Sequence, residues 1–271
     1  MVRGVRLEVS VTEVEIVSDV LWSLGVTAIT EDWTSDDVVV LRTSFGSNDD
    51  KIAELMSKHL PDVVWCDEEI DSEVAETWKK FAGPTRIDDR LYIRPSWDVS
   101  SLAPDAIVVS IDPGATFGMG DHPTTRGCLA LLADSVEPGE SVLDVGCGSG
   151  VLGICSLVLG AESAHGIDIA TASLETSRAN AERNGVSDRW QVSLDSLASV
   201  AQSFDTVVAN ILAPVLIDLA VDLVRVARHR IIISGLLDTR EGSVVEVLAP
   251  FVERRRTVVD GWVTIELVRP G

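Results

Sequence analysis

The chain has 271 residues, more than one compact domain of ordinary size requires, and its length suggests two domains. Its 43 acidic and 22 basic residues give a net charge of −21, which disfavours direct nucleic-acid binding and suits a basic protein partner. The same charge also suits a protein that is simply soluble. No uncharged apolar run reaches the roughly 18 residues that a membrane span needs, so we expect no membrane insertion.

The start of the chain leads into alternating residues and not into the uninterrupted apolar segment of a secretory signal. The four cysteines include no C-x-x-C pair, and the four histidines are scattered without ligand spacing. We therefore expect a cytoplasmic protein with reduced cysteines and no metal site. The sequence does not determine the oligomeric state, and a monomer is our working expectation.

The first seventy residues alternate strand-like and helix-like segments. The expected elements are strands at 5–11, 26–30, 38–41 and 63–65, with helices at 12–25 and 50–59. This β-α-β-β-α-β order is that of the ferredoxin-like sandwich. We predict that residues 1–70 form a small ferredoxin-like α+β domain that recognises the substrate.

Residues 71–82 have a helical composition that stops before Gly83-Pro84. We predict that residues 71–90 form a helical linker that allows the flanking domains to reorient. Strand-like segments follow at 91–94 and 107–111.

Beyond residue 137, buried strand-like segments alternate with helices, the pattern of a parallel sheet covered on both faces. Near the end, Asp260-Gly261 separates two β-rich runs, which predicts a hairpin and hence an antiparallel edge. We therefore predict a Rossmann-like α/β domain over residues 91–271, with a mostly parallel sheet and an antiparallel C-terminal hairpin.

A glycine-rich loop carries the strongest chemical signal. Residues 141–152 pass from an apolar strand through Asp144-Val-Gly146-Cys-Gly148-Ser-Gly into an apolar helix. Glycines there let the backbone approach a ligand closely. The G-x-G-x-x-G spacing of a dinucleotide loop is missing, and Asp144 beside the loop would oppose a pyrophosphate and favour a ligand with a positive amine. S-adenosylmethionine carries such an amine.

Polar residues also end two later strands. Asp168 lies about 20 residues beyond the glycine loop, where an acid accepts hydrogen bonds from two ribose hydroxyls. Both NAD and S-adenosylmethionine contain that ribose, so Asp168 does not choose between them. Asn210 ends the fourth strand, where its carbonyl oxygen can hold an incoming amine, although a turn-forming Asn is the alternative.

Four segments together closely resemble the ribosomal protein L11 methyltransferase family. They are the run from Ile111 to Thr125, the glycine loop, Gly-Ile-Asp at 166–168 and Asn-Ile-Leu-Ala at 210–213. The resemblance is dense from about residue 76 to the C-terminus and looser before it. Asn-Ile-Leu-Ala discriminates best, because adenine-amine methyltransferases carry a Pro-Pro-aromatic continuation there. The resemblance implies a class I methyltransferase domain, S-adenosylmethionine as cofactor, and N-methylation of lysine side chains and of the N-terminal amine of L11, a basic ribosomal protein.

The resemblance also implies roles for individual residues. Thr125 is expected beside the cofactor, Gly146 against its methionine part and Asp168 on its ribose. Asn210 is expected next to the transferred methyl group and the substrate amine, as the catalytic residue. Phe117 is expected to help wall the pocket.

The chain departs from the family's Gly-Thr-Gly-Thr-His-Pro-Thr-Thr pattern at Met119 and Asp121. This puts in doubt how the loop closes and which substrate it admits. The alternatives are a lysine methyltransferase with another protein target, a small-molecule or nucleic-acid methyltransferase, a non-catalytic S-adenosylmethionine-binding module and, more distantly, an NAD-linked dehydrogenase.

Overall fold

The computed structural model describes residues 2–23, 26, 29–35, 37–43, 52–70, 82–114, 116–237 and 241–270. The chain divides into two compact units. The first is Met1–Gly83 with Gly114–Phe117, and the second is Pro84–Pro113 with Gly118–Gly271. None of the helices in these described residues is both long enough and apolar enough to cross a membrane.

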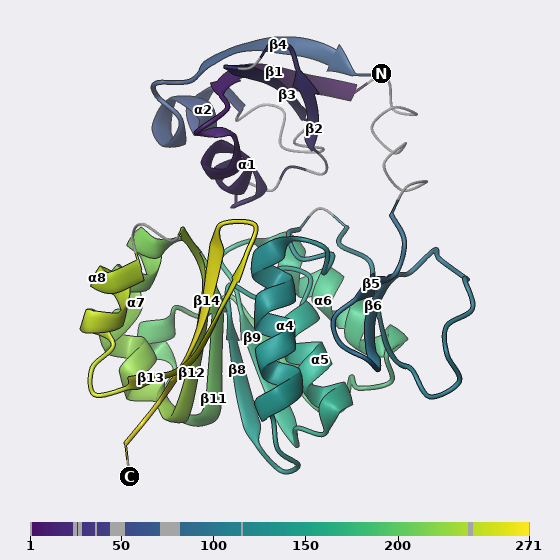
Figure 1. The fold of residues 1–271 in the computed structure, drawn as a ribbon, viewed down its shortest axis with the longest axis vertical. Helices are drawn as coiled ribbons and strands as arrows, with labels where there is room; N and C mark the ends of the chain where they lie inside the picture. The colour runs from purple at the N-terminus through teal and green to yellow at the C-terminus, as the bar shows by residue number, and fades with distance from the viewer. Residues whose placement is uncertain are drawn as a thin grey trace. The chain divides into compact units, whose positions relative to one another are not determined.

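The first unit has the ferredoxin-like element order. Its elements are β1 (Val2–Ser10), α1 (Val14–Ser23), β2 (Ile29–Trp33), β3 (Val38–Thr43), α2 (Ile52–His59) and β4 (Val64–Ile70). The strands form one sheet in the order β2-β3-β1-β4, and each pair is antiparallel (Figure 1). Leu7, Leu21, Leu41 and Met56 are fully buried in its core. The apolar stripe of each helix therefore packs on the inward face of the sheet.

Strand β2 and the segment after the first unit differ from what the sequence predicted. Strand β2 begins at Ile29, three residues after the expected start, and ends at Trp33. It is an edge strand whose residues after Ile29 are exposed, so it lacks the apolar alternation that marks a half-buried strand. Of the expected linker, residues 71–81 lie outside the described residues, whereas Thr85–Arg86 form β5 in the second unit.

The second unit is built on a seven-stranded sheet. Its order is β10-β9-β8-β11-β12-β14-β13, parallel from β10 to β12 with β14 and β13 antiparallel (Figure 1). The strands are β8 (Ser141–Val145), β9 (Ser163–Ile167), β10 (Trp190–Ser193), β11 (Phe204–Asn210), β12 (Ala227–Leu237), β13 (Val252–Val259) and β14 (Trp262–Val268). The helices are α4 (Pro123–Ser135), α5 (Val151–Leu159), α6 (Thr171–Arg183), α7 (Ala213–Val226) and α8 (Glu241–Val247), with a 3-10 turn at Leu197–Ser199.

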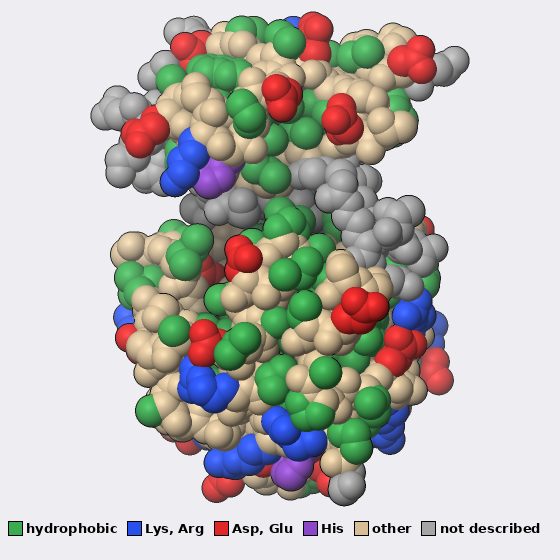
Figure 2. Space-filling model, turned by 90° about the vertical axis from the view of Figure 1, so that its left-hand side faces the viewer, with side chains coloured by type: hydrophobic (Ala, Val, Ile, Leu, Met, Phe, Trp, Pro, Cys, Tyr) green, Lys and Arg blue, Asp and Glu red, His purple; other side chains and the backbone are tan. Residues whose placement is uncertain are grey.

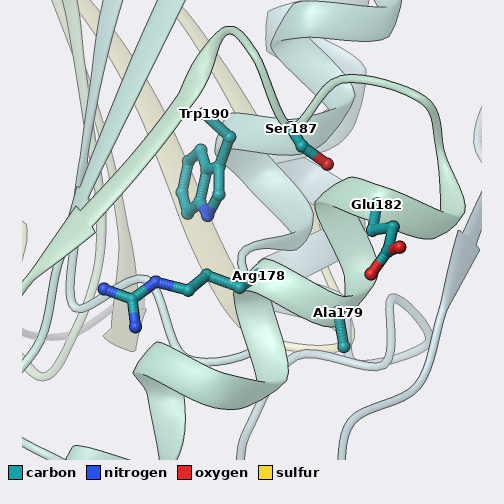
Figure 3. Close-up of a pocket in the computed structure, with 5 residues that line it drawn as sticks. All are labelled: Arg178, Ala179, Glu182, Ser187 and Trp190. Atoms are coloured by element: carbon teal, nitrogen blue, oxygen red, sulfur yellow. The ribbon is translucent and has the colours of Figure 1, made fainter.

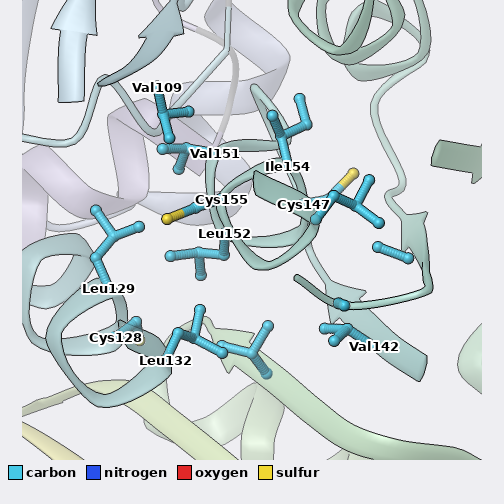
Figure 4. Close-up of a cluster of buried hydrophobic side chains, with 14 of the residues drawn as sticks. Val109, Cys128, Leu129, Leu132, Val142, Cys147, Val151, Leu152, Ile154 and Cys155 are labelled. Carbon is cyan, nitrogen blue, oxygen red and sulfur yellow. The ribbon is translucent and has the colours of Figure 1, made fainter. Parts of the chain in front are cut away.

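Each central strand contributes to two cores, because successive side chains point to opposite faces of a sheet. Val208 packs with α4 and α5 in one core, part of which Figure 4 shows. Its neighbours Val207 and Ala209 pack with α7 and α8 in the other. Figure 1 shows the same division, with α4 and α5 on one side of the sheet and α7 and α8 on the other. Both faces are thus covered, and ligands can reach the sheet only at its edges.

Two further features complete this unit. Asp260 and Gly261 join β13 to β14 with φ values of 51° and 81°, as a type I′ hairpin turn requires, which confirms the predicted hairpin. The strands expected near 91–94 and 107–111 form a separate three-stranded sheet of β5 (Thr85–Arg86), β6 (Leu91–Pro95) and β7 (Ile107–Ile111). The buried side chains of this small sheet pack in the same core as α5, on one face of the main sheet.

Candidate active site

The glycine loop turns sharply between β8 and α5. Gly146, Gly148 and Gly150 have φ values of 71°, 51° and 80°, a region that side chains with a Cβ rarely adopt. The N–H groups of Gly146 and Cys147 donate to the carbonyl oxygen of Ile167, at 2.9 and 3.1 Å, so the loop is fastened to the end of β9. Gly146 is exposed, and its backbone is open to a ligand.

Asp168 follows directly on β9 and faces the same loop. One of its carboxylate oxygens accepts from the N–H of Gly148 at 2.8 Å, and the other accepts from the N–H of Ala170 at 2.8 Å. The carboxylate is half-buried, and each oxygen keeps a lone pair for a further donor. The structure therefore fixes this acid beside the glycine loop and leaves it able to accept hydroxyl groups.

Asp144 lies beneath the loop and not on its surface. Its side chain is 1% exposed, and one oxygen accepts from the N–H of Gly153 at 2.9 Å. The other oxygen is buried and accepts no hydrogen bond from the described residues. Burial, aided by the negative charge of Asp168, raises the pKa of Asp144 to about 7. A nearby positive charge would offset the cost of keeping this carboxylate ionised.

Asn210 ends β11 and meets the first turn of α4. Its Nδ2 donates to the hydroxyl oxygen of Thr125 at 3.3 Å, across 85 residues of sequence. Thr125 is 1% exposed, whereas Asn210 is half-buried. The structure thus brings these two candidate residues into direct contact with each other.

Asn210 is the last residue of β11, and Asp168 follows β9. These two strands lie on either side of β8, the strand that leads into the glycine loop. In an open parallel sheet, ligands bind outside the carboxyl ends of such strands, and helices begin there. We call this the carboxyl edge. Phe117 belongs to the segment Gly114–Phe117, which groups with the first unit, so its expected place in the pocket stays a prediction.

Two residues at this edge, and a third beside the glycine loop, were not predicted from the sequence. Ile169, next to Asp168, is 95% exposed, an unusual position for so large an apolar side chain and a surface on which a flat ring can pack. Gly235 has φ 86° and lies so close to Ile211 that a Cβ there would be 2.4 Å from the Ile211 carbonyl oxygen. An isolated apolar residue or glycine carries no pattern from which its role follows.

Trp190, the third, supports the glycine loop from below. A Cβ on Gly153 would lie 2.3 Å from its ring, and one on Gly166 would lie 2.5 Å from it. The indole N–H donates to the Ser177 hydroxyl at 3.4 Å. The two glycines, outside the G-x-G-x-G run, therefore make room for this ring.

Trp190 also lines a separate hollow of about 560 Å³ (Figure 3). Arg178, Ala179, Glu182 and Ser187 line it with Trp190. Arg178, Ala179 and Glu182 belong to the later turns of α6, Ser187 lies in the connection after it, and Trp190 begins β10. The Arg178 guanidinium donates to the Val192 carbonyl at 3.4 Å. Neither Asp168 nor Asn210 lines this hollow.

A family model described as ribosomal protein L11 methyltransferase (PrmA) matches residues 9–270. The chain belongs to this family. The strand order of the second unit of this chain is that of a class I methyltransferase, as predicted. The resemblance stated from the four sequence segments is thereby confirmed.

Individual relatives agree with this membership. The L11 methyltransferase of Syntrophotalea carbinolica is 43% identical over 184 residues, which cover 65% of this chain and 59% of that protein. The L11 methyltransferase of a Thermoanaerobacter species is 35% identical over 240 residues, covering 86% of this chain and 75% of that protein. A crystal structure of the ribosomal protein L11 methylase of Lactobacillus delbrueckii subsp. bulgaricus superposes with a TM-score of 0.63 at 30% identity, covering 70% of this chain and 100% of that one. The match to the Syntrophotalea protein thus spans less than two thirds of its length.

Proposed function

We propose that this protein transfers methyl groups from S-adenosylmethionine to amines of ribosomal protein L11, either lysine side chains or the N-terminal amine. The meeting of Gly146, Asp168 and Asn210 at one edge, in a chain of this family, carries the proposal. We further propose that the protein acts in the cytoplasm, as a monomer, without direct contact to nucleic acid.

The residues at the carboxyl edge fit this cofactor. The exposed backbone of Gly146 would lie against its methionine part, where the buried charge of Asp144 favours the ammonium group. Asp168 would accept its ribose hydroxyls. The exposed side chain of Ile169 would cover one face of the adenine. S-adenosylmethionine, when bound, would supply a methyl group on a sulfonium; the lone pair of a neutral amine would attack that methyl carbon in line, and the sulfur would leave with the bonding pair as a thioether.

The protein's own contribution is orientation and electrostatics. A lysine has a pKa of about 10.4 and must lose a proton before it attacks, to water or to a nearby group. Asn210 would then accept an amine N–H through its carbonyl oxygen and direct the lone pair at the methyl group. His122 is an unsuitable base: burial lowers its pKa, and its Nδ1 is hydrogen-bonded to the Thr124 hydroxyl at 2.8 Å.

A different protein target is the second candidate. Met119 and Asp121 stand where the family pattern has threonines, directly before α4 and its Thr125. Target choice would reside in this loop and in the first unit, whose match to the family pattern is looser. The class of reaction and the cofactor are the same under both candidates.

Labelled methyl transfer to purified large-subunit ribosomal proteins, resolved by intact-mass spectrometry, tests the proposal. A mass gain in multiples of one methyl on L11 alone is expected. Label on another protein would retain the reaction and replace the target. Cofactor binding with no label on any protein would indicate a non-catalytic module or a small-molecule substrate.

Asn210→Ala tests the role of the amide. Because Asn210 would act on the amine, its removal should lower the methylation rate about 100-fold and change the Kd for S-adenosylmethionine by less than about threefold. Single-turnover rates and calorimetry give the two values. Equal losses in rate and in cofactor affinity would remove Asn210 from the proposed role.

A further inference from the structure

Helix α7 begins three residues after Asn210 and carries apolar side chains on two sides. The buried row, which packs in the core on the sheet, consists of Leu216, Ala220 and Leu223. The second row, which faces outward, consists of Pro214, Ile217 and Val221. Residues three and four apart lie on the same side of a helix, so the outward row forms one continuous surface. We call it the α7 stripe.

The exposure of the α7 stripe is not explained by the stability of the helix. Val221 is 81% exposed and Ile217 is 39% exposed. Both are β-branched residues, which lower helix propensity relative to alanine, and an exposed side chain adds little to the core. Single exposed apolar residues are ordinary, whereas a row of them on successive turns marks an interaction surface. Helix α6 also starts at the carboxyl edge, but its exposed residues after the first turn are Glu175, Arg178, Ala179, Glu182 and Arg183.

The α7 stripe starts beside the proposed methyl-transfer site. Pro214 follows Asn210 by four residues, and Val221 lies about 12 Å along the helix from Ala213. A protein substrate that forms an interface of standard size would cover about 800 Å² of this chain, which corresponds to a disc about 16 Å in radius. Such an interface, centred on Asn210, reaches the α7 stripe.

We infer that the α7 stripe is a docking surface for the protein substrate of the methyl transfer. The inference rests on the proposed function and names a surface that holds the substrate while its amine is at Asn210. Acidic residues flank the stripe, since Asp218 and Asp222 lie one turn apart along one side of it. Figure 2 shows hydrophobic side chains among acidic ones on the face of the second unit that carries α7 and α8. The surface thus fits a basic protein that presents apolar side chains with Lys or Arg beside them.

Glutamine substitutions test the α7 stripe without a change of charge. Ile217→Gln combined with Val221→Gln places good helix formers at both positions and removes the apolar surface. We expect the KM for L11 to rise about tenfold and kcat to stay within about twofold, because docking precedes the methyl-transfer step. Val221→Gln alone changes only an exposed side chain and should raise the KM about threefold. Circular dichroism melts confirm that each variant is folded.

Val252→Gln is the matched control. Val252 is 50% exposed and lies opposite Val268 in β14, level with Arg230 at the amino end of β12. Its KM for L11 should stay within about twofold of wild type. Apolar contacts are not screened by salt, so the factor by which the double variant raises KM should be about the same at 50 and 300 mM salt. A photo-crosslinking amino acid at position 221 should attach to L11, and the same group at position 252 should not.

Three results would overturn the inference. A fall in kcat with an unchanged KM would mean that the glutamines disturb the reaction site and not the docking of L11. An equal rise in KM in Val252→Gln would show that the effect does not belong to the α7 stripe. A protein that methylates L11 but forms no cross-link from position 221 would place the substrate elsewhere. A wild-type protein that binds cofactor and methylates no protein would instead overturn the proposed function, and this inference with it.

Discussion

At the scale of single residues, Asp144 carries the largest electrostatic cost in the site. It is fully buried, with one oxygen bonded to the Gly153 N–H and the other accepting no hydrogen bond from the described residues. Burial raises its pKa to about 7, whereas an unfolded chain gives a pKa near 3.9. Between these values the folded protein binds the proton more tightly than the unfolded chain. Stability must therefore fall as the pH rises through this window.

Asp144→Asn, which removes the charge and keeps the shape, isolates this effect. Relative to the Asn variant, the wild-type free energy of unfolding should decrease by about 2–3 kcal/mol between pH 5 and pH 8. Urea unfolding at the two pH values measures it. Saturating S-adenosylmethionine should remove most of the decrease, since the proposed ammonium group compensates the charge. A wild-type-minus-Asn difference that is the same at both pH values would mean that the carboxyl titrates normally.

The positions of Asp168 and Asn210 at strand ends, and of the glycine loop after a strand, could be predicted from the sequence, because strand ends and glycine loops have local signatures; their roles stay predictions. The hydroxyl that Asn210 engages could not be predicted that way. Thr125 is 85 residues from Asn210 in sequence, and their contact depends on the packing of α4 against β14. The burial of Asp144 beneath the loop, with an oxygen bonded to the Gly153 N–H, also could not be predicted from the spacing. Contacts across elements follow from packing, which no local pattern encodes.

At the scale of elements, Asn180 of α6 fastens two loops to one helix. Its side chain is fully buried. The Nδ2 group donates to the carbonyl oxygens of Asp112 and Ser149, at 2.8 and 2.9 Å, and Oδ1 accepts from the N–H of Asp112 at 2.9 Å. Asn184, one turn later, bonds in the same manner to Ser110 and does not touch the glycine loop. The two asparagines therefore differ mainly in that Asn180 is hydrogen-bonded to the glycine loop and Asn184 is bonded to Ser110 instead.

Asn180→Ala removes bonds to three backbone groups, which cost about 1–3 kcal/mol each when they lose their partners. We expect the free energy of unfolding to fall by about 3 kcal/mol or more and the Kd for S-adenosylmethionine to rise about tenfold, because Ser149 belongs to the glycine loop. Asn184→Ala should destabilise the protein less and leave the Kd within about twofold. Urea unfolding and calorimetry measure both. A larger effect of Asn184→Ala on cofactor binding would contradict the assignment.

Element order was predictable because hydrophobic periodicity survives in buried strands. The central parallel strands of the second unit contain short apolar runs, such as Ile231-Ile232-Ile233 in β12, and the Asp260-Gly261 dipeptide marks the hairpin. Strand β2 was misplaced because an exposed edge strand has no such periodicity. Of the three-stranded sheet, β6 and β7 were predicted as isolated strands and β5 was not predicted, because the pairing of β6 with β5 and β7 joins separate segments and leaves no local pattern.

At the scale of the second unit, exposed acidic side chains gather at the carboxyl edge of the sheet. Arg228 and Arg230 stand at the amino end of β12, where they pair with acids, Arg228 with Asp205 and Arg230 with Glu140 and Glu266. Figure 2 shows basic and acidic side chains together at the lower end of the unit. The carboxyl edge is acidic. Its exposed or half-buried acids are Asp121, Asp168, Asp195 and Asp260, each of which follows a strand or precedes the start of α4. With a net charge of −21, the molecule presents a negative field around the proposed methyl-transfer site.

Such a field attracts a basic protein substrate, and salt screens it. We expect the KM for L11 to rise about tenfold between 50 and 300 mM salt, with kcat nearly constant, because the attraction acts on encounter and not on the methyl-transfer step. The Kd for S-adenosylmethionine, measured by calorimetry over the same range, is the control and should change less than about threefold. Methylation rates at several salt and L11 concentrations give the two kinetic constants.

Asp121 offers the sharpest variant for this test, since the family pattern has an uncharged threonine in its place. It is exposed, directly before the His122 cap of α4, and outside the hydrogen bond between Thr125 and Asn210. Asp121→Thr should raise the KM for L11 about two- to threefold at low salt and flatten its salt dependence, with kcat preserved. A lower KM in this variant would mean that Asp121 obstructs L11, and would favour a different protein target for this chain.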